Sequence, residues 1–258
     1  MNIIGIIPAR MASSRFPGKP LAKIHGMPMI GHTFLRSKMS KLMTKVYVAT
    51  CDEEIKDYIE SIGGDVIMTK NTHPSAADRT VEATEIFEKR TNSKADIVVL
   101  IQGDDPMITP KSIDDALKVM LDDSNIGILT LVRKINDLGE FNDQDIVKVI
   151  SDLEENAIYF TREPVPSLRK GADPNNAPMF KHVAIILFKK ESLEKFSKYP
   201  QTPLELVEEI DLIRVIEYGE KIRIVADDSI TYNVDTPKAL LNVEDAMKGD
   251  SLMKLYHK

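Results

Sequence analysis

The feature that most constrains the fold is a short aliphatic run near the amino terminus, directly followed by a basic loop. The run Ile3–Ile7 is rich in β-branched residues and ends at Pro8, which predicts a strand buried on both faces. A helical pattern begins at Pro28, so the loop between them lies at the carboxyl end of a strand. In an open α/β sheet, ligands bind at this place.

The loop Pro8–Pro20 carries the cationic side chains Arg10, Arg15 and Lys19 among small residues. Backbone N–H groups and cations held close together suit a polyanion, and a triphosphate is the commonest small ligand that needs both. A solvated basic loop is the alternative interpretation of the same charges. The loop lacks the Gly-x-x-x-x-Gly-Lys-Ser/Thr and Gly-x-Gly-x-x-Gly patterns, which argues against a P-loop or a Rossmann dinucleotide site.

Further along the chain, aliphatic strands alternate with helices. We expect strands at 45–50, 65–69 and 96–101, and helices at about 52–63 and 78–88. This alternation predicts βαβ units and a mostly parallel central sheet with helices on both faces. The predicted fold class is therefore α/β.

The pattern changes in the second half of the chain. Short strand-like runs without long helices between them lie at 126–132, 146–150, 157–160 and 181–188. The range 164–179 is rich in Pro, Asn, Asp and Gly and predicts a loop. Such an insertion predicts an antiparallel flap or a subunit contact. A strand at 221–226 and a helix at about 237–247 follow. Because no linker divides the chain, we expect a single domain over 1–258 with an excursion at about 133–188.

Composition excludes several classes of protein. The chain has 258 residues, enough to bury a sizeable core, and its net charge of -6 argues against a general nucleic-acid binder. Cys51 is the single cysteine, so an internal disulfide and a Cys/His zinc cluster are excluded. The sequence shows no signal-peptide pattern and no apolar run near the ~20 residues of a membrane span. We therefore expect a cytoplasmic protein without membrane insertion.

A second polar segment, Gln102–Pro106, follows the strand predicted at 96–101. The adjacent carboxylates of Asp104 and Asp105 suit a hard cation such as Mg²⁺, and Gly103 allows close backbone approach. A polar strand-to-helix turn is the alternative, because Gly, Asp and Pro favour turns. Far downstream, Asp235 precedes Thr-Pro and is a candidate helix cap.

Several segments resemble the CMP-sugar-acid synthetases, and most closely those that act on 3-deoxy-manno-octulosonate. These segments are Ile7-Pro8-Ala9-Arg10, Ser14-Arg15, Pro17-Gly18-Lys19-Pro20-Leu21, Gly26-Met27-Pro28-Met29-Ile30, Gln102-Gly103-Asp104-Asp105-Pro106 and Val234-Asp235-Thr236-Pro237. The resemblance implies a nucleotidyltransferase fold and transfer of CMP from CTP to the anomeric hydroxyl of a 2-keto-3-deoxy sugar acid, with release of pyrophosphate. It also implies Mg²⁺ as cofactor and a homodimer that serves lipopolysaccharide or capsule biosynthesis.

The resemblance also implies roles for individual residues. Those expected to bind the nucleotide are Pro8, Ala9, Arg10, Ser14, Arg15, Lys19, Gln102 and Gly103. Arg10, Lys19 and Asp104 would act in catalysis, and Asp104 and Asp235 would hold the metal. Those expected to bind the acceptor are Ser75, Arg79, Gln102, His182, Glu205, Glu208 and Asp211. Arg79 would meet the acceptor's carboxylate with a bidentate fork, whereas a lone histidine such as His182 is otherwise a satisfied structural group.

The chain departs from the family pattern on the predicted acceptor side. The family's Ser-Gly-Thr-Asp/Glu-Arg, Gly-Ile-Tyr and Glu-Gln are here Ser75-Ala76-Ala77-Asp78-Arg79, Ala184-Ile185-Ile186 and Asp211-Leu212, and Cys51 stands where Asp is common. Because an apolar pocket leaves a polyol unsatisfied, a different acid, such as a nonulosonate or a phosphonate, is one interpretation. Compensation elsewhere in the pocket is another. A nucleotide-binding relative without turnover is the interpretation outside the enzyme class, and the intact Lys19, Asp104 and Asp235 argue against it.

Overall fold

The computed structural model describes residues 1–13, 15–169, 177–229 and 232–257. The chain forms two compact units, of which the first comprises Met1–Leu117 with Ser229–Lys258 and the second comprises Lys118–Asp228. The excursion predicted at about 133–188 falls inside the second unit, and the single-domain description stays a prediction. The nucleotide-binding role predicted for Ser14 and the part of the predicted loop at 170–176 lie outside the described residues.

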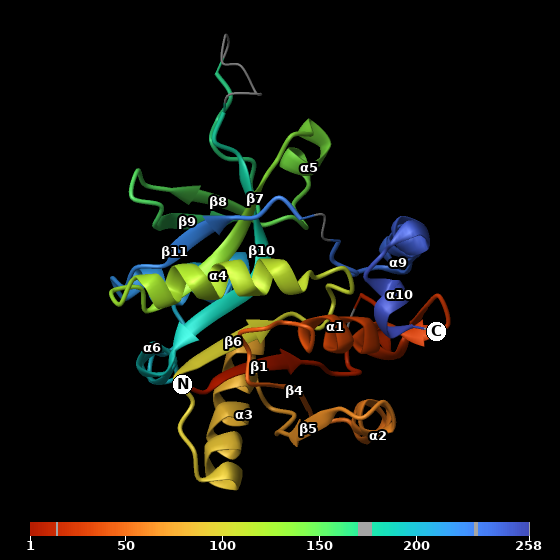
Figure 1. Cartoon of the computed structure of the whole chain (residues 1–258). Coiled ribbons are helices and arrows are strands. Elements are labelled where there is room, and N and C mark those ends of the chain that lie inside the picture. Colours follow the sequence, from red (N-terminus) through yellow and green to blue (C-terminus); the bar gives the residue numbers. More distant parts are fainter. Residues whose placement is uncertain (14, 170–176, 230–231, 258) are drawn as a thin grey trace. The chain divides into compact units, whose positions relative to one another are not determined.

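The first unit is built on a parallel sheet (Figure 1). In spatial order its strands are β6 (Ile97–Ile101), β1 (Ile3–Pro8), β4 (Lys45–Thr50) and β5 (Asp65–Met68), and each of these pairings is parallel. Every residue of β1 and β6 is buried, which explains their uninterrupted aliphatic sequences. The predicted parallel sheet is confirmed, and the predicted strand ranges are correct to within one residue at each end.

Three helices pack against this sheet, namely α1 (Met29–Ser37), α2 (Glu53–Ser61) and α3 (Ala76–Thr91). The next helix, α4 (Pro110–Asp122), follows β6 and crosses the boundary of the units. The helix predicted at 78–88 begins earlier, because the Ser75 hydroxyl caps it by accepting from Asp78 N at 3.2 Å. The sequence analysis did not predict α4.

Short elements complete the first unit around the loop that follows β1. They are η1 (Lys19–Leu21), β2 (Lys23–Ile24), β3 (Met27–Pro28), α9 (Pro237–Ala246), η3 (Met247–Gly249) and α10 (Met253–Tyr256). A small core of Ile24, Met29, Val234, Val243 and Met247 joins the carboxyl-terminal segment to the start of α1. Residues distant in sequence are thereby held beside the loop.

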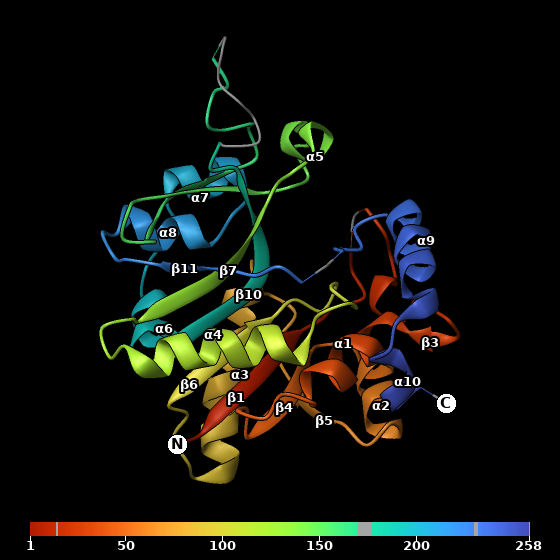
Figure 2. The same cartoon turned by 45° about the horizontal axis from the view of Figure 1, so that its top comes forward.

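The second unit has a mixed sheet (Figure 2). Its strands are β7 (Ile128–Lys134), β8 (Lys148–Ser151), β9 (Ala157–Thr161), β10 (Phe180–Lys189) and β11 (Arg223–Ala226). The β7–β10, β10–β8 and β8–β9 pairings are antiparallel, as predicted for this part, and β11 pairs parallel with β7. Its helices are α5 (Leu138–Asn142), α6 (Lys190–Phe196), α7 (Pro203–Glu208) and α8 (Leu212–Glu217). Within the part of the chain that the structure describes, no helix is long and apolar enough to cross a membrane.

Candidate active site

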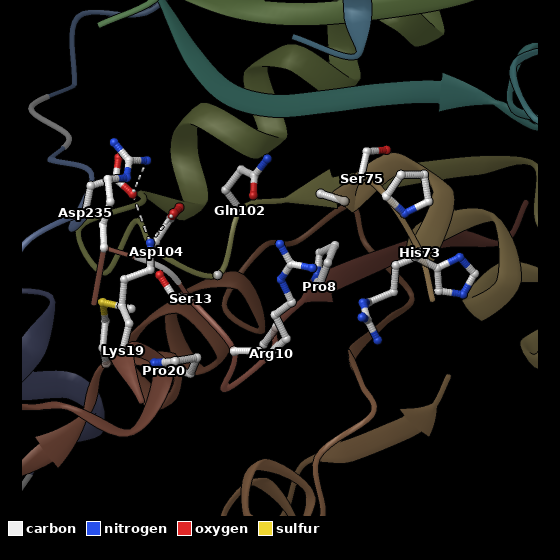
Figure 3. A pocket seen from close by; sticks show the side chains of 18 residues that line it. Pro8, Arg10, Ser13, Lys19, Pro20, His73, Ser75, Gln102, Asp104 and Asp235 are labelled. Carbon is white, nitrogen blue, oxygen red and sulfur yellow. Dashed lines mark hydrogen bonds and ion pairs between the residues drawn. The ribbon is translucent and has the colours of Figure 1, made fainter. Parts of the chain in front are cut away.

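A cavity of about 310 Å³ lies in the first unit, where β1 and β6 end (Figure 3). The residues predicted to bind the nucleotide that line it are Pro8, Ala9, Arg10, Arg15, Lys19, Gln102 and Gly103. The predicted metal ligands Asp104 and Asp235 line the same cavity, as do Ser75 and Arg79 from the predicted acceptor set. The fold therefore gathers these side chains at the sheet edge expected from the sequence, and their roles stay predictions.

Lys19 holds the two predicted metal carboxylates together. Its Nζ donates to Asp104 Oδ2 at 2.8 Å and to Asp235 Oδ1 at 3.1 Å, and Arg15 Nη2 lies 3.1 Å from the same Asp235 oxygen (Figure 3). Burial lowers the pKa of the Lys19 ammonium, but Asp104 and Asp235 together outweigh burial and raise the pKa above its ordinary value. Lys19 therefore stays charged at neutral pH.

Asp235 reaches this cluster through a backbone contact. Val234 N donates to Asp104 O at 2.9 Å, which joins the two segments that carry the carboxylates. The alternative reading of Asp235 as a helix cap is wrong, because Thr236 is the N-cap of α9 and its hydroxyl accepts from Ala239 N at 3.1 Å. The Asp235 carboxylate thus faces the cavity rather than serving the helix.

The carboxylates offer oxygen atoms that fit a hard cation. Asp104 Oδ1 is buried and has no hydrogen-bond partner among the described residues, which is a costly state for a carboxylate oxygen. Asp105 is 4% exposed and its Oδ1 accepts from Met107 N at 3.2 Å, so of the adjacent pair only Asp104 lines the cavity. The described residues contain no cluster of three or more His, Cys, Asp or Glu side chains suited to a metal. A Mg²⁺ ion here would take its remaining ligands from substrate phosphates and water.

The loop after β1 and the loop after β6 approach each other closely at Gly103, as predicted. A Cβ atom at this residue would lie 2.9 Å from the carbonyl oxygen of Pro8, so only glycine fits. Across the loop after β1, Gly18 adopts a left-handed φ of 73° and its N–H donates to Met11 O at 3.0 Å. Arg10, within that loop, is exposed and has no ion pair or hydrogen bond to another described residue.

The loop before α3 contributes a residue that the sequence analysis missed. His73 lines the cavity, and its Nε2 lies 2.6 Å from Glu82 Oε2. No periodic spacing connects a loop histidine with a glutamate in the second turn of the next helix, so the sequence held no signal for the pair. The neighbouring Arg79 is 3% exposed and donates Nη1 to Thr69 Oγ1 at 2.6 Å and to Lys70 O at 3.1 Å. Part of the fork predicted to bind a carboxylate is therefore already bonded to the protein.

The remaining predicted acceptor residues lie in the second unit, where they have partners. His182 Nε2 is 2.7 Å from Thr130 Oγ1, and burial lowers the His182 pKa to about 4, so the ring is neutral at pH 7. Glu208 accepts from Thr161 Oγ1 at 2.7 Å and from Arg162 N at 2.9 Å. Asp211 is the half-buried N-cap residue of α8.

Glu205 is the most enclosed of these residues. It is 3% exposed, and its Oε2 accepts from Arg214 Nε at 2.8 Å and from Thr202 N at 3.1 Å at the start of α7. These contacts give the Glu205 carboxylate a structural role that does not require an acceptor. Contact of Glu205 with an acceptor stays a prediction.

Three of the apolar departures from the family pattern occupy core positions. Ala77 is fully buried, and Ile186 and Leu212 are each 1% exposed. Their apolar character therefore follows from packing within their own units. Ala76 is different, because it lines the cavity.

Comparison with known proteins gives a consistent result. Residues 4–222 match the cytidylyltransferase family. The chain is 38% identical over 255 residues to the 3-deoxy-manno-octulosonate cytidylyltransferase of Geobacter metallireducens, a match that covers 96% of this chain and 98% of that one. It is also 38% identical over 239 residues to the 8-amino-3,8-dideoxy-manno-octulosonate cytidylyltransferase of Shewanella piezotolerans, covering 92% of this chain and 95% of that one.

Solved structures agree with these sequence matches. A CMP:2-keto-3-deoxy-manno-octonic acid synthetase complexed with CTP superposes with a TM-score of 0.86 at 35% identity, covering 96% of this chain and 98% of that chain. A cytidylyltransferase from Leptospira borgpetersenii, at 21% identity and a TM-score of 0.61, shares the fold. These matches confirm the predicted fold class, a mostly parallel central sheet with helices on both faces.

Proposed function

Because this chain belongs to the cytidylyltransferase family, we propose that it transfers CMP from CTP to the anomeric hydroxyl of 3-deoxy-manno-octulosonate. The protein is a CTP-dependent enzyme. The observation that carries the choice of reaction is the cluster of Lys19, Asp104 and Asp235 in the cavity at the strand ends. This cluster combines a bridging ammonium with an unpartnered carboxylate oxygen, and these are groups that a triphosphate and its metal ion need.

On the nucleotide side, we propose that Arg10, Arg15 and Lys19 bind the triphosphate, with Pro8, Ala9, Gln102 and Gly103 forming the adjoining walls. The acceptor hydroxyl oxygen would attack the α-phosphorus in line, and the bond from that phosphorus to the oxygen of the β-phosphate would break. The hydroxyl proton passes to solvent water, and pyrophosphate leaves. Fixed cations stabilise charge on the leaving group without reorganising, which is the dominant contribution to phosphoryl-type transfer.

Asp104 and Asp235 are the residues that would hold Mg²⁺. When bound, the ion would offset charge on the phosphate and lower the pKa of the acceptor hydroxyl. The buried, unpartnered Asp104 Oδ1 supports this assignment, and so does the position of both carboxylates on the cavity wall. Before the metal binds, the Lys19 ammonium would offset the repulsion between the two carboxylates that it bridges.

On the acceptor side, we propose Ser75, Arg79 and Gln102 from the cavity and His182, Glu205, Glu208 and Asp211 from the second unit. Burial of Ala77, Ile186 and Leu212 supports a sugar acid of the 3-deoxy-manno-octulosonate type, because these departures need not face the acceptor. The 8-amino analogue is a second candidate, since a relative named for it is as similar in identity as one named for 3-deoxy-manno-octulosonate.

We further propose a cytoplasmic homodimer that serves lipopolysaccharide or capsule biosynthesis. Exposed apolar side chains of the second unit support the dimer, because their burial in an interface would favour association. They are Leu153, Ile158, Leu204, Leu206 and Val207. Sedimentation velocity of the full chain tests it. A monomer at assay concentration would contradict the dimer and leave the proposed reaction unaffected.

The reaction is tested by pyrophosphate release from each of the four nucleoside triphosphates with Mg²⁺, with and without each candidate acceptor. We expect pyrophosphate release only when CTP and 3-deoxy-manno-octulosonate are both present, and not with another nucleotide or another acceptor. Release only with the 8-amino analogue would replace the acceptor and keep the nucleotide assignment. No release with any acceptor, in a protein that binds CTP, would overturn the proposed reaction.

A further inference from the structure

We infer that Asp52 is a positioning residue for the loop after β1, an inference that rests on the proposed binding of a triphosphate by that loop. Asp52 lies outside the cavity wall. Its Oδ2 accepts a hydrogen bond from Met11 N at 2.7 Å, across a separation of 41 residues. A charged acceptor makes this one of the stronger classes of backbone contact.

The hydrogen bond from Met11 N to the Asp52 carboxylate takes the place of a helix N-cap bond. Asp52 is the N-cap residue of α2, where a carboxylate normally accepts from an amide of its own helix. Among the described residues it makes no such side-chain cap. The Asp52 backbone N–H donates to Thr50 Oγ1 at 3.1 Å. Cys51 Sγ lies 3.7 Å from Asp52 Oδ2, the oxygen that accepts from Met11 N. The side chain is thus directed away from α2 and toward the loop.

The contact fixes the backbone on one side of Arg10. On the other side, Ala9 N donates to Ala49 O at 2.9 Å, so both neighbours of Arg10 are bonded to the end of β4 and the residues after it. The Arg10 side chain itself is exposed and has no partner among the described residues. A fixed backbone that carries an uncommitted guanidinium is preorganised for an anion, which reduces the ordering cost of binding.

The same contact reaches the other end of the loop through Met11. While Met11 N is held by Asp52, Met11 O accepts from Gly18 N at 3.0 Å, directly before Lys19. One carboxylate therefore supports the backbone that presents both Arg10 and Lys19. Loss of the carboxylate would loosen two of the cations proposed to bind the triphosphate.

The experiment compares CTP binding and steady-state kinetics of Asp52→Ala, Asp52→Asn and the matched control Glu54→Ala. Glu54 is an exposed acidic residue in the same first turn of α2, so its removal changes charge equally. We expect Asp52→Ala to raise the Kd and the KM for CTP about tenfold, without changing the KM for the acceptor. Asp52→Asn keeps an oxygen that accepts from Met11 N, so it should stay within about threefold of the wild type.

Hydrogen exchange at the Met11 amide provides a readout independent of activity. We expect faster exchange at this amide in Asp52→Ala and unchanged exchange in Asp52→Asn and Glu54→Ala. Unchanged CTP affinity in Asp52→Ala, or equal losses in the Ala and Asn variants, would overturn the inference. If Asp52→Ala fails to fold, the Met11 amide of the wild type decides, because exchange there as fast as in an unprotected loop amide would overturn the inference. Failure of the wild type to bind CTP would instead contradict the proposed function and, with it, this inference.

Discussion

The charged groups on the cavity wall of the first unit differ from Glu205 and Glu208 of the second unit in how far their polar atoms are bonded to the protein. In the first unit, groups on the cavity wall keep atoms uncommitted, such as the exposed Arg10 guanidinium and the buried Asp104 Oδ1, which have no partner among the described residues. In the second unit, Glu205 and Glu208 are bonded to neighbours of their own unit. A buried polar atom without a partner costs about 1–3 kcal/mol, so on the wall of a cavity, as for Asp104, its retention indicates a ligand. A fully bonded carboxylate is explained by stability alone.

The strongest test of this contrast is Asp104→Asn. Because the amide removes one negative charge from the proposed metal site, we expect kcat with CTP and Mg²⁺ to fall about 10³-fold. The melting temperature should stay close to that of the wild type. Pyrophosphate release measures the loss, and Asp122→Asn, at an exposed position on α4, is the control. Retention of full activity would show that the uncommitted oxygen has no part in the reaction.

Glu205→Gln tests the opposite case. Breaking the buried pair with Arg214 leaves a charge unpaired and should lower the free energy of unfolding by about 3–5 kcal/mol. Denaturant unfolding measures this loss. The double variant Glu205→Leu with Arg214→Met removes both charges and should recover much of the stability. If that stable double variant still shows a raised KM for the acceptor, Glu205 touches the acceptor as well as supporting the fold.

Lowering the pH should reduce the folding stability of both units by similar amounts. Burial lowers the pKa of His32 in the first unit and of His182 in the second to about 4, from an ordinary value of 6.5. Between these values the unfolded chain binds protons that the folded chain does not, so stability falls as pH drops from 6.5 toward 4. At pH 5.5 the loss should be about 1 kcal/mol per histidine. Denaturant midpoints measured against pH check this, and His182→Gln should remove about half of the dependence.

Of these changes, Arg79→Lys should have the smallest effect. It tests whether Arg79 contacts the acceptor or the nucleotide. Lysine cannot form the bidentate fork, so we expect a rise of about tenfold in the KM for the acceptor. The bonds of Arg79 to Thr69 and Lys70 predict a small stability loss as well. A rise confined to the KM for CTP would assign Arg79 to the nucleotide instead, in keeping with its position on the same cavity as Pro8 and Ala9.

Sequence reasoning succeeded where a local pattern has one physical explanation. The aliphatic runs of β1 and β6 can only be strands buried on both faces, and Gly103 proved to allow a contact that a Cβ would block. It missed α4, and it missed His73 and Glu82, which meet through a loop and a helix without regular spacing. The apolar departures suggested a changed acceptor pocket, but most of them are core residues. One sequence cannot show which face a residue occupies when the neighbouring segment is irregular.

The sequence by itself determined the parallel sheet, the basic loop at its edge and the family resemblance, because hydrophobic periodicity and loop composition are local properties. Only the tertiary structure decided that Asp104 and Asp235 share one ammonium, since the bond from Val234 N to Asp104 O joins segments more than a hundred residues apart. It also decided that Asp52 supports the loop rather than its own helix. Such contacts depend on chain topology, and the sequence does not show which distant group a side chain will bond to.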